Sequence, residues 1–413
     1  MGARWLLGGM RGRTLASGPG SERGSLGLRD RPFAVELGRV GTRVGRGSVG
    51  DVQEALIVAG GAGTRLRPLT DTTPKPLLPF CAAPFLAGVL ARLAEAGVRR
   101  VWLVVGADPF PFRVLEPVAR AHGMELEAVP EPEPLDTAGG VRSVIERCEG
   151  SAFVLNGDVL TDVDLGAVGR GHVAAGADAT LVLTRVEDTS TFGVCVLDGE
   201  RITGFVEKPP PGTLPGQDAV NAGTYVLEPA ALARFPLGRL SFERRVFPDL
   251  VASGALVRGV VSDAAWADLG TPERYLEGHR LALSGALTWP TLAALPADAD
   301  GLRSGPDVAV APGATVVGPA LFAAGVTVGD GARVGPDVVL GAGCRVGAGA
   351  TVTDSVLGAG TVVGAGATVE GLVTGSGAAV ADAAVIAGPV VLGDGAIAPA
   401  GPVLGAGTRI PAV

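Results

Sequence analysis

A short stretch near residue 60 combines the residue types that bind phosphate. The run Gly60–Arg65 reads Gly-Gly-Ala-Gly-Thr-Arg, and Lys75 follows it within Thr-Pro-Lys-Pro. Consecutive glycines let backbone N–H groups approach an anion, and the forked guanidinium of an arginine donates to phosphate oxygens. The run is not a P-loop, because no Gly-Lys-Ser/Thr follows, and Leu66 stands where a dinucleotide fingerprint needs its third glycine. We therefore expect a phosphate-binding loop of another kind, within reach of Lys75.

Lysine is almost absent from the chain, which makes the positions of its two lysines informative. Lys75 and Lys208 stand against 32 arginines, and each lies in a proline-bounded motif, Thr-Pro-Lys-Pro and Val-Glu-Lys-Pro. Where arginine supplies every other fixed positive charge, a retained lysine indicates a need for a compact ammonium on a flexible stem. We therefore predict that both lysines contact phosphate.

Two aspartates have a context that suits a metal ion. Asp158 follows the predicted strand 152–155 in Asn-Gly-Asp, and Asp268 lies in Trp-Ala-Asp-Leu-Gly-Thr-Pro. A lone aspartate after a strand is more often a turn or cap residue than a ligand. Two carboxylates together with phosphate oxygens, however, suit Mg²⁺, which keeps several waters and uses few protein ligands. The pair favours a Mg²⁺ site.

The elements that must position these residues have the pattern of an α/β domain. Short apolar runs typical of buried parallel strands occur at 55–59, 101–105, 152–155, 179–183 and 224–227. Helical patterns occur at 84–97 and 137–147. This alternation predicts a doubly wound sheet that binds its ligands at the carboxyl ends of the strands.

A different pattern begins near Val308. An aliphatic residue followed by glycine recurs every six residues, as at Val328, Val334, Leu340 and Val346. A hexapeptide period kept over many copies predicts a solenoid β-helix, whose aliphatic residues point into the stack. The chain is then expected to divide into a disordered Gly/Arg-rich extension or mis-assigned start over 1–53, an α/β domain over 54–285, a linker over 286–307 and the β-helix over 308–413.

Composition limits the classes of partner. The net charge is −8, and residues 1–50 are basic, so the remainder is more acidic still. An acidic body argues against nucleic acid or an anionic membrane as the main partner. There is no apolar run long enough to span a membrane, and the four cysteines are dispersed without paired spacing. We expect a cytoplasmic protein that binds neither nucleic acid nor membrane.

Taken in order, the motifs resemble those of the nucleotide-sugar pyrophosphorylases, which are sugar-1-phosphate nucleotidyltransferases. The resemblance runs from about Glu54 to Leu283, and the hexapeptide tail matches the longer members of the family. Within the family, the stretch Ser241–Pro248 and the spacing from Glu207 to Asn221 are most similar to mannose-1-phosphate guanylyltransferases. The resemblance implies a Rossmann-like α/β domain with a mixed, mostly parallel sheet, followed by a left-handed β-helix.

The same resemblance implies an enzyme that transfers a nucleotidyl group from an NTP, with GTP favoured, to a hexose 1-phosphate. Lys75 would neutralise the α-phosphate and the leaving pyrophosphate, and Lys208 would hold the sugar phosphate, with Mg²⁺ on Asp158 and Asp268. The implied catalytic residues are Arg65, Lys75, Asp158 and Lys208. The implied sugar-binding residues are Glu207 and Asn221.

Nucleotide binding is implied for a further set of residues: Gly60, Gly61, Gly63, Thr64, Glu131 and Asp136. Glu131 lies where relatives carry a side chain that reads the base. Asp136 is a departure, because many relatives place glycine there, close to the nucleotide. The resemblance therefore does not fix which base is bound. Glucose-1-phosphate thymidylyl-, uridylyl- or adenylyltransferase activity remains an alternative.

Two other classes of protein deserve comparison. Hexapeptide β-helices often belong to acyltransferases, but that chemistry usually needs a histidine base in the solenoid. All three histidines, His122, His172 and His279, precede it. We therefore expect the solenoid to make contacts in a homo-oligomer. A non-catalytic regulatory paralogue is disfavoured because both carboxylates, both lysines and Arg65 are present together.

Overall fold

The computed structural model of the chain describes residues 52–413. The extension predicted over 1–53 therefore lies outside the described residues, apart from its last two positions. Among the described residues, no helix is long and apolar enough to cross a membrane.

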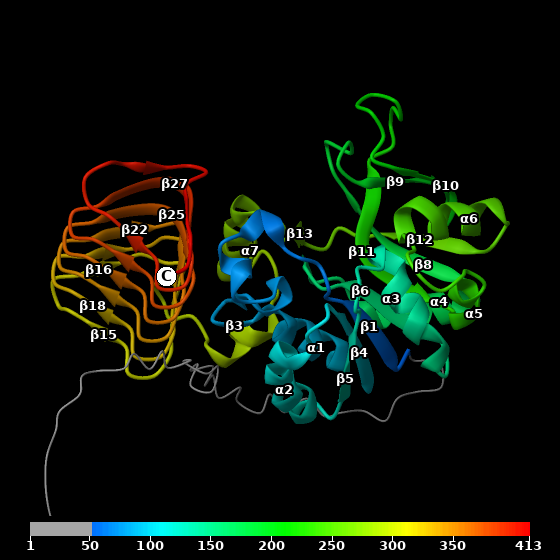
Figure 1. The fold of residues 1–413 in the computed structure, drawn as a ribbon, viewed down its shortest axis with the longest axis horizontal. Coiled ribbons are helices and arrows are strands. Elements are labelled where there is room, and N and C mark those ends of the chain that lie inside the picture. The colour runs from blue at the N-terminus through cyan, green and yellow to red at the C-terminus, as the bar shows by residue number, and fades with distance from the viewer. Residues whose placement is uncertain (1–51) are drawn as a thin grey trace, which may run out of the picture. The chain divides into compact units, whose positions relative to one another are not determined.

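A nine-stranded mixed sheet forms the centre of the first domain (Figure 1). Its strands are β1 (Glu54–Val58), β4 (Arg100–Val105), β5 (Glu125–Pro130), β6 (Ala152–Asn156), β8 (Ala179–Arg185), β9 (Gly193–Asp198), β10 (Arg201–Glu207), β11 (Ala219–Leu227) and β12 (Val257–Val261). The order is β5-β4-β1-β6-β11-β8-β12-β10-β9. Parallel pairing joins β5, β4, β1 and β6, and also β8 with β12, whereas β11 and β10 pair antiparallel with their neighbours.

The five strands predicted from apolar runs are confirmed as β1, β4, β6, β8 and β11. The prediction missed β5, β9, β10 and β12. β5 has no buried residue and β10 has one, so neither forms a continuous buried run. Because a strand at the margin of the sheet has one polar face, its sequence lacks the continuous apolar signal of a central strand.

Helices cover both faces of this sheet. They are α1 (Phe85–Glu95), α2 (Glu116–Ala121), α3 (Asp136–Val144), α4 (Leu165–Ala175), α5 (Pro229–Ala233), α6 (Phe247–Ala252) and α7 (Pro272–Ser284). Alternate residues of β1 pack into two separate cores: Ile57 packs with α1, α4 and α7, and Leu56 with α3 and α6. This alternation follows from the two-residue period of a strand.

Short elements complete the domain and carry much of the pocket. The two small sheets are β2 (Pro79–Phe80) with β3 (Ala83–Pro84), and β7 (Val159–Thr161) with β13 (Trp266–Asp268). The 3₁₀ segments are η2 (Thr64–Leu66), η3 (Leu69–Asp71), η4 (Lys75–Leu77), η5 (Phe110–Leu115), η6 (Ile145–Arg147) and η8 (Pro290–Ala294), and η7 (Phe242–Val246) is a π-helical turn.

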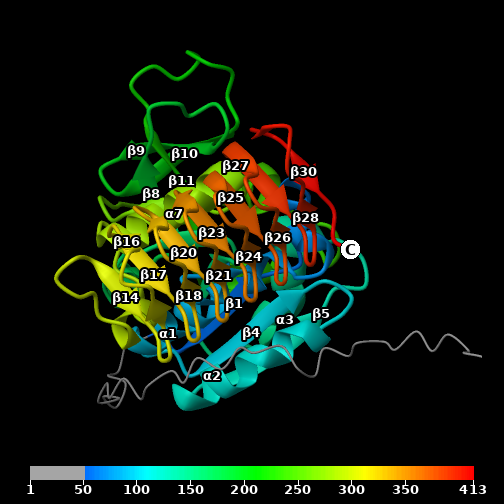
Figure 2. The same cartoon turned by 90° about the vertical axis from the view of Figure 1, so that its left-hand side faces the viewer.

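The second part of the chain is a parallel β-helix, whose stacked coils face the viewer in Figure 2. Ala309 pairs with Thr327, and Thr327 pairs with Arg345, so each coil takes 18 residues there, or three hexapeptides. The aliphatic residues of the repeat, among them Val328, Val334 and Leu340, are buried inside the stack as predicted. Its first nine strands are β14 (Leu302–Ser304), β15 (Ala309–Val310), β16 (Thr315–Val316), β17 (Ala320–Phe322), β18 (Thr327–Val328), β19 (Arg333–Val334), β20 (Val338–Leu340), β21 (Arg345–Val346) and β22 (Thr351–Thr353). The remaining strands are β23 (Ser355–Leu357), β24 (Val362–Val363), β25 (Thr368–Thr374), β26 (Ala379–Val380), β27 (Val385–Leu392), β28 (Ile397–Ala398), β29 (Leu404–Gly405) and β30 (Arg409–Ile410).

The solenoid begins earlier than the repeat pattern indicates. The stretch 286–307, expected to be a linker, contains η8 and β14, and β14 pairs in parallel with β17. Its residues Leu302–Ser304 lack the aliphatic-glycine step, so the pattern did not reveal them as part of a coil. The expected oligomer through the β-helix stays a prediction.

Side chains connect the solenoid to the α/β domain. α7 packs against β25 and β27, and Arg280 of α7 donates to both carboxylate oxygens of Asp354 at 2.8 and 3.1 Å. Arg409 of β30 donates to the backbone carbonyls of Arg65 and Arg67. The last coil thus hydrogen-bonds to the backbone of the segment that follows β1.

Candidate active site

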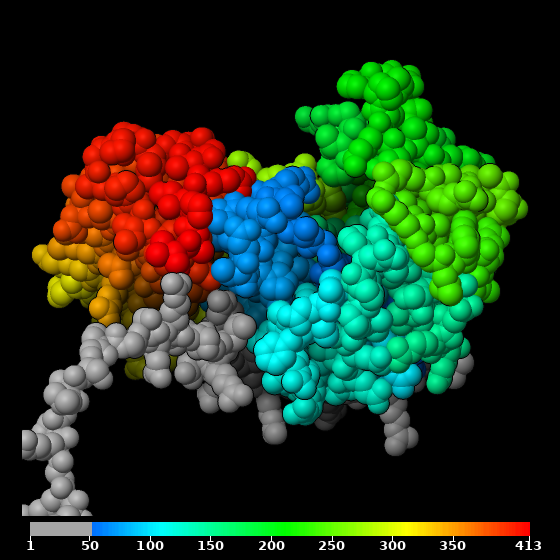
Figure 3. Space-filling view, in the orientation of Figure 1, coloured from blue at the N-terminus to red at the C-terminus, as the bar shows by residue number. Residues whose placement is uncertain are grey.

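One pocket of about 340 Å³ gathers seven of the thirteen predicted site residues. Those residues are Arg65, Asp136, Asp158, Glu207, Lys208, Asn221 and Asp268. They come from the ends of strands or the loops after them, because Asp158 follows β6, Glu207 ends β10 and Asp268 ends β13. The surface is hollowed between the segments coloured blue and green in Figure 3. The geometry therefore brings residues from distant parts of the sequence to one site.

The glycine loop after β1 has a backbone shape that only a small residue adopts easily. Gly63 has φ of 59°, in the left-handed region. A Cβ at Gly63 would also lie 2.9 Å from Cγ2 of Thr70, whose hydroxyl donates to the Gly63 carbonyl at 2.9 Å. Around Gly61 there is open space, and Thr64 is exposed. The loop therefore presents accessible backbone to a ligand, as a phosphate cradle requires.

Lys75 does not line the pocket, but it forms an ion pair with Asp158, which does. The ammonium of Lys75 donates to Oδ2 of Asp158, and the lysine side chain is only 10% exposed. Lys75 begins η4 and packs beside Gly63, so the turn after the glycine loop carries the lysine to the carboxylate that follows β6. Lys75 and Asp158, which were both predicted to take part in the same reaction, are therefore in direct contact.

Asp268 lies next to Asp158 through backbone pairing. β13 pairs antiparallel with β7, and the N–H of Leu269 donates to the carbonyl of Asp158 at 3.0 Å. The Trp266 indole N–H donates to the carbonyl of Ala222 at 3.0 Å and so anchors the strand that carries Asp268.

The carboxylate of Asp268 has one buried oxygen without a partner. Its Oδ2 accepts from Arg274 of α7, whereas Oδ1 is buried and has no hydrogen-bond partner among the described residues. A Cβ at Gly270 would lie 2.3 Å from that oxygen and 2.6 Å from Nη2 of Arg65, so both side chains converge there. An orphaned carboxylate oxygen beside a second aspartate fits an oxygen-ligated divalent cation. Within residues 52–413, no group of three or more His, Cys, Asp or Glu is placed to hold a metal, so a cation here would need substrate or water ligands as well.

Lys208 and Glu207 stand at another wall of the pocket. Their charged groups lie 3.2 Å apart, and Lys208 is 63% exposed. Lys208 has φ of 48°, a conformation that residues other than glycine rarely adopt, and its N–H donates to the carbonyl of Phe192 at 2.9 Å. Asn221 is held by its neighbours, because its amide donates to the Tyr225 hydroxyl at 2.9 Å and its oxygen accepts from the Gly223 N–H at 3.0 Å.

Glu131 lies beside the glycine loop rather than among the residues that line the pocket. A Cβ at Gly60 would be 2.9 Å from Oε2 of Glu131, and a Cβ at Gly140 would be 2.1 Å from Oε1. Oε1 is buried and has no partner among the described residues. Burial raises the pKa of the Glu131 carboxyl above its ordinary value. The two glycines leave space for a carboxylate that is ready to accept hydrogen bonds.

Asp136 begins α3 in a left-handed conformation, with φ of 66°. Its Oδ1 accepts from the N–H of Thr137 at 2.9 Å, and its Oδ2 accepts from Nη2 of Arg244 at 2.6 Å. The predicted role of Asp136 near the nucleotide stays a prediction, but its carboxylate is occupied by protein partners. Glycine is common at such a φ, and aspartate is among the few other residues that tolerate it.

Sequence analysis gave no role to several residues that line or support the pocket. Thr137, Ser241, Glu243 and Arg244 line it, and Arg274 contacts Asp268. Three of the five lie in the stretch Ser241–Pro248 that carries the family resemblance. Thr137, Glu243 and Arg244 could not be assigned because their contacts join segments that are about a hundred residues apart. Arg274 lies only six residues from Asp268, but one arginine among many gave no signal.

Comparison with known proteins agrees with this geometry. Residues 54–285 match the family model described as nucleotidyl transferase, and residues 316–406 match that of the GMPPB C-terminal domain. A mannose-1-phosphate guanylyltransferase of Mycobacterium tuberculosis is 38% identical over 283 residues, which cover 67% of this chain and 76% of that protein. A probable mannose-1-phosphate guanylyltransferase of Oryza sativa is 34% identical, over 73% of this chain and 80% of the relative.

Among solved structures, a candidate glucose-1-phosphate thymidylyltransferase of Bacillus anthracis in complex with sucrose shares the fold. It has a TM-score of 0.51 at 20% identity and covers 56% of this chain and 95% of that one. The α/β fold, the two family models and the extent of the sequence matches lead to one conclusion. The chain belongs to the nucleotidyl transferase family, and within it to the mannose-1-phosphate guanylyltransferases.

Proposed function

We propose that this protein transfers GMP from GTP to mannose 1-phosphate and releases pyrophosphate. The observation that carries the proposal is the convergence of the Lys75–Asp158 pair, Asp268 and Lys208 on one pocket beside the glycine loop. Relatives at 34–38% identity are named for this activity.

The reaction needs positioning and charge compensation more than acid–base chemistry. An oxygen of the sugar 1-phosphate attacks the α-phosphorus of GTP, and the bond from that phosphorus to the pyrophosphate oxygen breaks. The nucleophile is already anionic, so no general base or covalent intermediate is required. In this proposal Lys75 and Arg65 bind the nucleotide phosphates and Lys208 binds the sugar phosphate, which lowers the repulsion between the two anions.

Nucleotidyl transferases of this family generally use a divalent metal ion. We propose Mg²⁺ here, held by Asp158 and by the Asp268 oxygen that has no partner within residues 52–413. When bound, such an ion supplies positive charge to the phosphate oxygens. Lys75 and Arg274, which contact the two carboxylates, keep them in place and compensate their charge when no metal is bound.

Glu131 supports guanine as the base. A carboxylate accepts two hydrogen bonds side by side, and guanine offers two adjacent donors, N1–H and the 2-amino group. Uracil and thymine offer a single N–H between two carbonyls, and adenine and cytosine place an acceptor next to their amino group. Because a site built to pair polar groups rejects ligands that leave them unpaired, the buried Glu131 oxygen favours guanine.

We predict that Glu131→Gln raises the KM for GTP about 10- to 100-fold, as expected for a lost hydrogen bond to a charged group. In the wild type, KM should also rise as the pH falls through the raised pKa of Glu131, because the protonated carboxyl accepts fewer hydrogen bonds. The glutamine variant should lose that pH dependence. Steady-state kinetics between pH 5 and pH 8 checks both effects. Glu133→Gln, an exposed change in the same loop, is the control and should behave as the wild type.

The test of the function is a matrix of nucleotides and sugar phosphates. GTP, dTTP, UTP, ATP and CTP are each combined with mannose-, glucose- and N-acetylglucosamine-1-phosphate, and pyrophosphate release is followed. We expect the highest kcat/KM for GTP with mannose 1-phosphate. A preference for dTTP with glucose 1-phosphate would refute the guanylyltransferase proposal and leave the reaction class intact.

A further inference from the structure

The charges that line the pocket do not balance two phosphorylated substrates. The lining side chains include three basic and five acidic residues, a formal charge of −2 that Lys75 on Asp158 and Arg274 on Asp268 bring to zero: Arg65, Lys208 and Arg244 against Asp136, Asp158, Glu207, Glu243 and Asp268. Lys208, the predicted ligand of the sugar phosphate, already pairs with Glu207 at 3.2 Å. A sugar phosphate carries up to two negative charges, so a second cation is needed on its side of the pocket.

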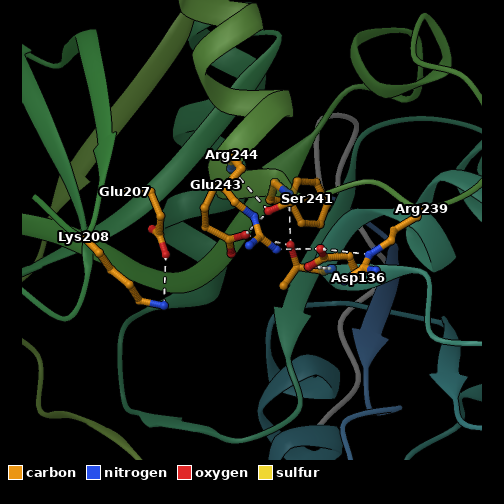
Figure 4. Close-up of polar contacts among 9 residues, drawn as sticks. Asp136, Glu207, Lys208, Arg239, Ser241, Glu243 and Arg244 are labelled. Carbon is orange, nitrogen blue, oxygen red and sulfur yellow. Dashed lines mark hydrogen bonds and ion pairs between the residues drawn. The ribbon is translucent and has the colours of Figure 1, made fainter.

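Arg244 is the described residue that fits this need (Figure 4). It lines the same pocket as Lys208 and its side chain is 65% exposed. Its Nη2 donates to Asp136 at 2.6 Å, and among the described residues its Nε and Nη1 have no partner. A guanidinium with free N–H groups in a pocket can bind a phosphate through two parallel hydrogen bonds.

The backbone that carries Arg244 is fixed against the start of α3. The N–H of Ala138 donates to the carbonyl of Leu240 at 2.9 Å, and the N–H of Phe242 donates to the hydroxyl of Thr137 at 2.9 Å. Ser241 caps the turn, because its hydroxyl accepts from the N–H of Arg244 at 3.3 Å. These bonds set the direction in which the Arg244 side chain leaves the backbone.

The carboxylate of Glu243 strengthens the same connection. Its Oε2 accepts from the hydroxyls of Thr137 at 2.7 Å and Ser241 at 2.9 Å. The network of Asp136, Thr137, Ser241, Glu243 and Arg244 therefore joins two segments that are more than a hundred residues apart (Figure 4).

We propose that Arg244 binds the phosphate of the sugar 1-phosphate together with Lys208, and that Asp136 is the positioning residue of Arg244. This inference rests on the proposed function and adds a substrate-binding residue to it. Asp136 holds the guanidinium in the pocket before substrate arrives, at a backbone position where glycine would be easier to accommodate.

Binding of phosphate does not require the loss of a strong interaction. Asp136 accepts through a single nitrogen of Arg244, whereas a phosphate can accept from two guanidinium nitrogens at once. Asp136 keeps its bond from the Thr137 N–H and has a second guanidinium nearby, since Nε of Arg239 lies 3.7 Å from its Oδ2. Arg244 can therefore turn to the substrate without leaving a bare carboxylate.

The test compares Arg244→Ala with Arg245→Ala. Arg245 is the next residue, is 66% exposed, pairs with Asp249 and does not line the pocket. We expect Arg244→Ala to raise the KM for mannose 1-phosphate about 10- to 100-fold while the KM for GTP changes less than about twofold. Arg245→Ala should leave both within about twofold. Arg244→Lys should recover part of the loss, and Asp136→Asn should raise the same KM by a smaller factor.

Binding measurements separate this inference from the proposed function. Mannose 1-phosphate is titrated calorimetrically into the wild type, Arg244→Ala and Arg245→Ala, each with an unchanged Tm, so that turnover is not required. A loss of at least about tenfold in affinity confined to Arg244→Ala supports the inference. Equal affinities, no binding to the wild type, or an equal rise of both KM values would overturn it. A wild type that binds the sugar phosphate but makes no GDP-mannose would refute the proposed function alone.

Discussion

Asp158→Asn should lower kcat about 100- to 1,000-fold in pyrophosphate release from GTP and mannose 1-phosphate, the range seen when one charge-stabilising group is removed. Asparagine keeps the size of the side chain and removes its charge. Lys75 then loses its ion-pair partner, and the oxygen set that fits a divalent cation loses one of its two carboxylates. The Km values should change far less than kcat, because the substrates keep their other contacts.

Asp164→Asn is the matched control for this change. Asp164 caps α4 by accepting from the N–H of Ala167 at 2.8 Å, and it does not line the pocket. Its neutral variant should retain kcat within about twofold, with at most a small loss of stability from the weaker cap. If Asp158→Asn kept more than about a tenth of the wild-type kcat, a central role for this carboxylate would be untenable.

Lys75→Arg should be nearly as damaging, although the charge is retained. Lys75 is 10% exposed, and its Cβ lies 3.1 Å from the position of a Cβ on Gly63. A longer planar guanidinium cannot occupy that space in the same geometry, so we expect kcat/KM to fall about 100-fold. Steady-state kinetics with the nucleotide varied is the direct measurement.

Lys208→Arg provides the contrast within the same protein. Lys208 is 63% exposed and faces open space, so an arginine can be accommodated, and kcat/KM should fall by less than about tenfold. Equal activity of the Lys75→Arg variant and the wild type would show that charge alone suffices at that position. The retention of lysine there would then have no physical explanation in its surroundings.

The central part of the fold could be predicted from the sequence because its signals are local. The apolar runs of β1, β4 and β6 and the hexapeptide period of the solenoid each arise from burial repeated along a short stretch. β10 carries Glu207 and precedes Lys208, yet it gives no such signal, because most of its residues are exposed or half-buried. Its antiparallel pairing with β9 crosses the two-residue loop Gly199–Glu200, so the Asp-Gly step at 198–199 was the local hairpin signal that could have found it.

The residues of the candidate site also differ in how strongly the local sequence signals them. Gly63, Lys75 and Asp158 could be picked out in the sequence because residue type and sequence neighbours predict their chemistry. Arg244 and Arg274 do not, since one arginine among 32 becomes informative only when its partner is known. Tertiary packing brings Asp136 to Arg244, and the short turn between β13 and α7 brings Asp268 to Arg274. The chemistry of single residues could therefore be predicted, whereas the pairs of side chains that contact each other could not.

The hydrogen bonds from Arg409 to the glycine-loop segment join parts of the chain that are synthesised far apart in time. The carbonyl of Arg65 is made early, whereas the guanidinium that binds it comes 344 residues later. Domains generally fold in order from the N-terminus as the chain emerges. The α/β domain can therefore be in place while this loop still lacks its last anchor. The loop gains this anchor only when the final coil of the solenoid has been made, and a chain interrupted in the solenoid would lack both hydrogen bonds from Arg409.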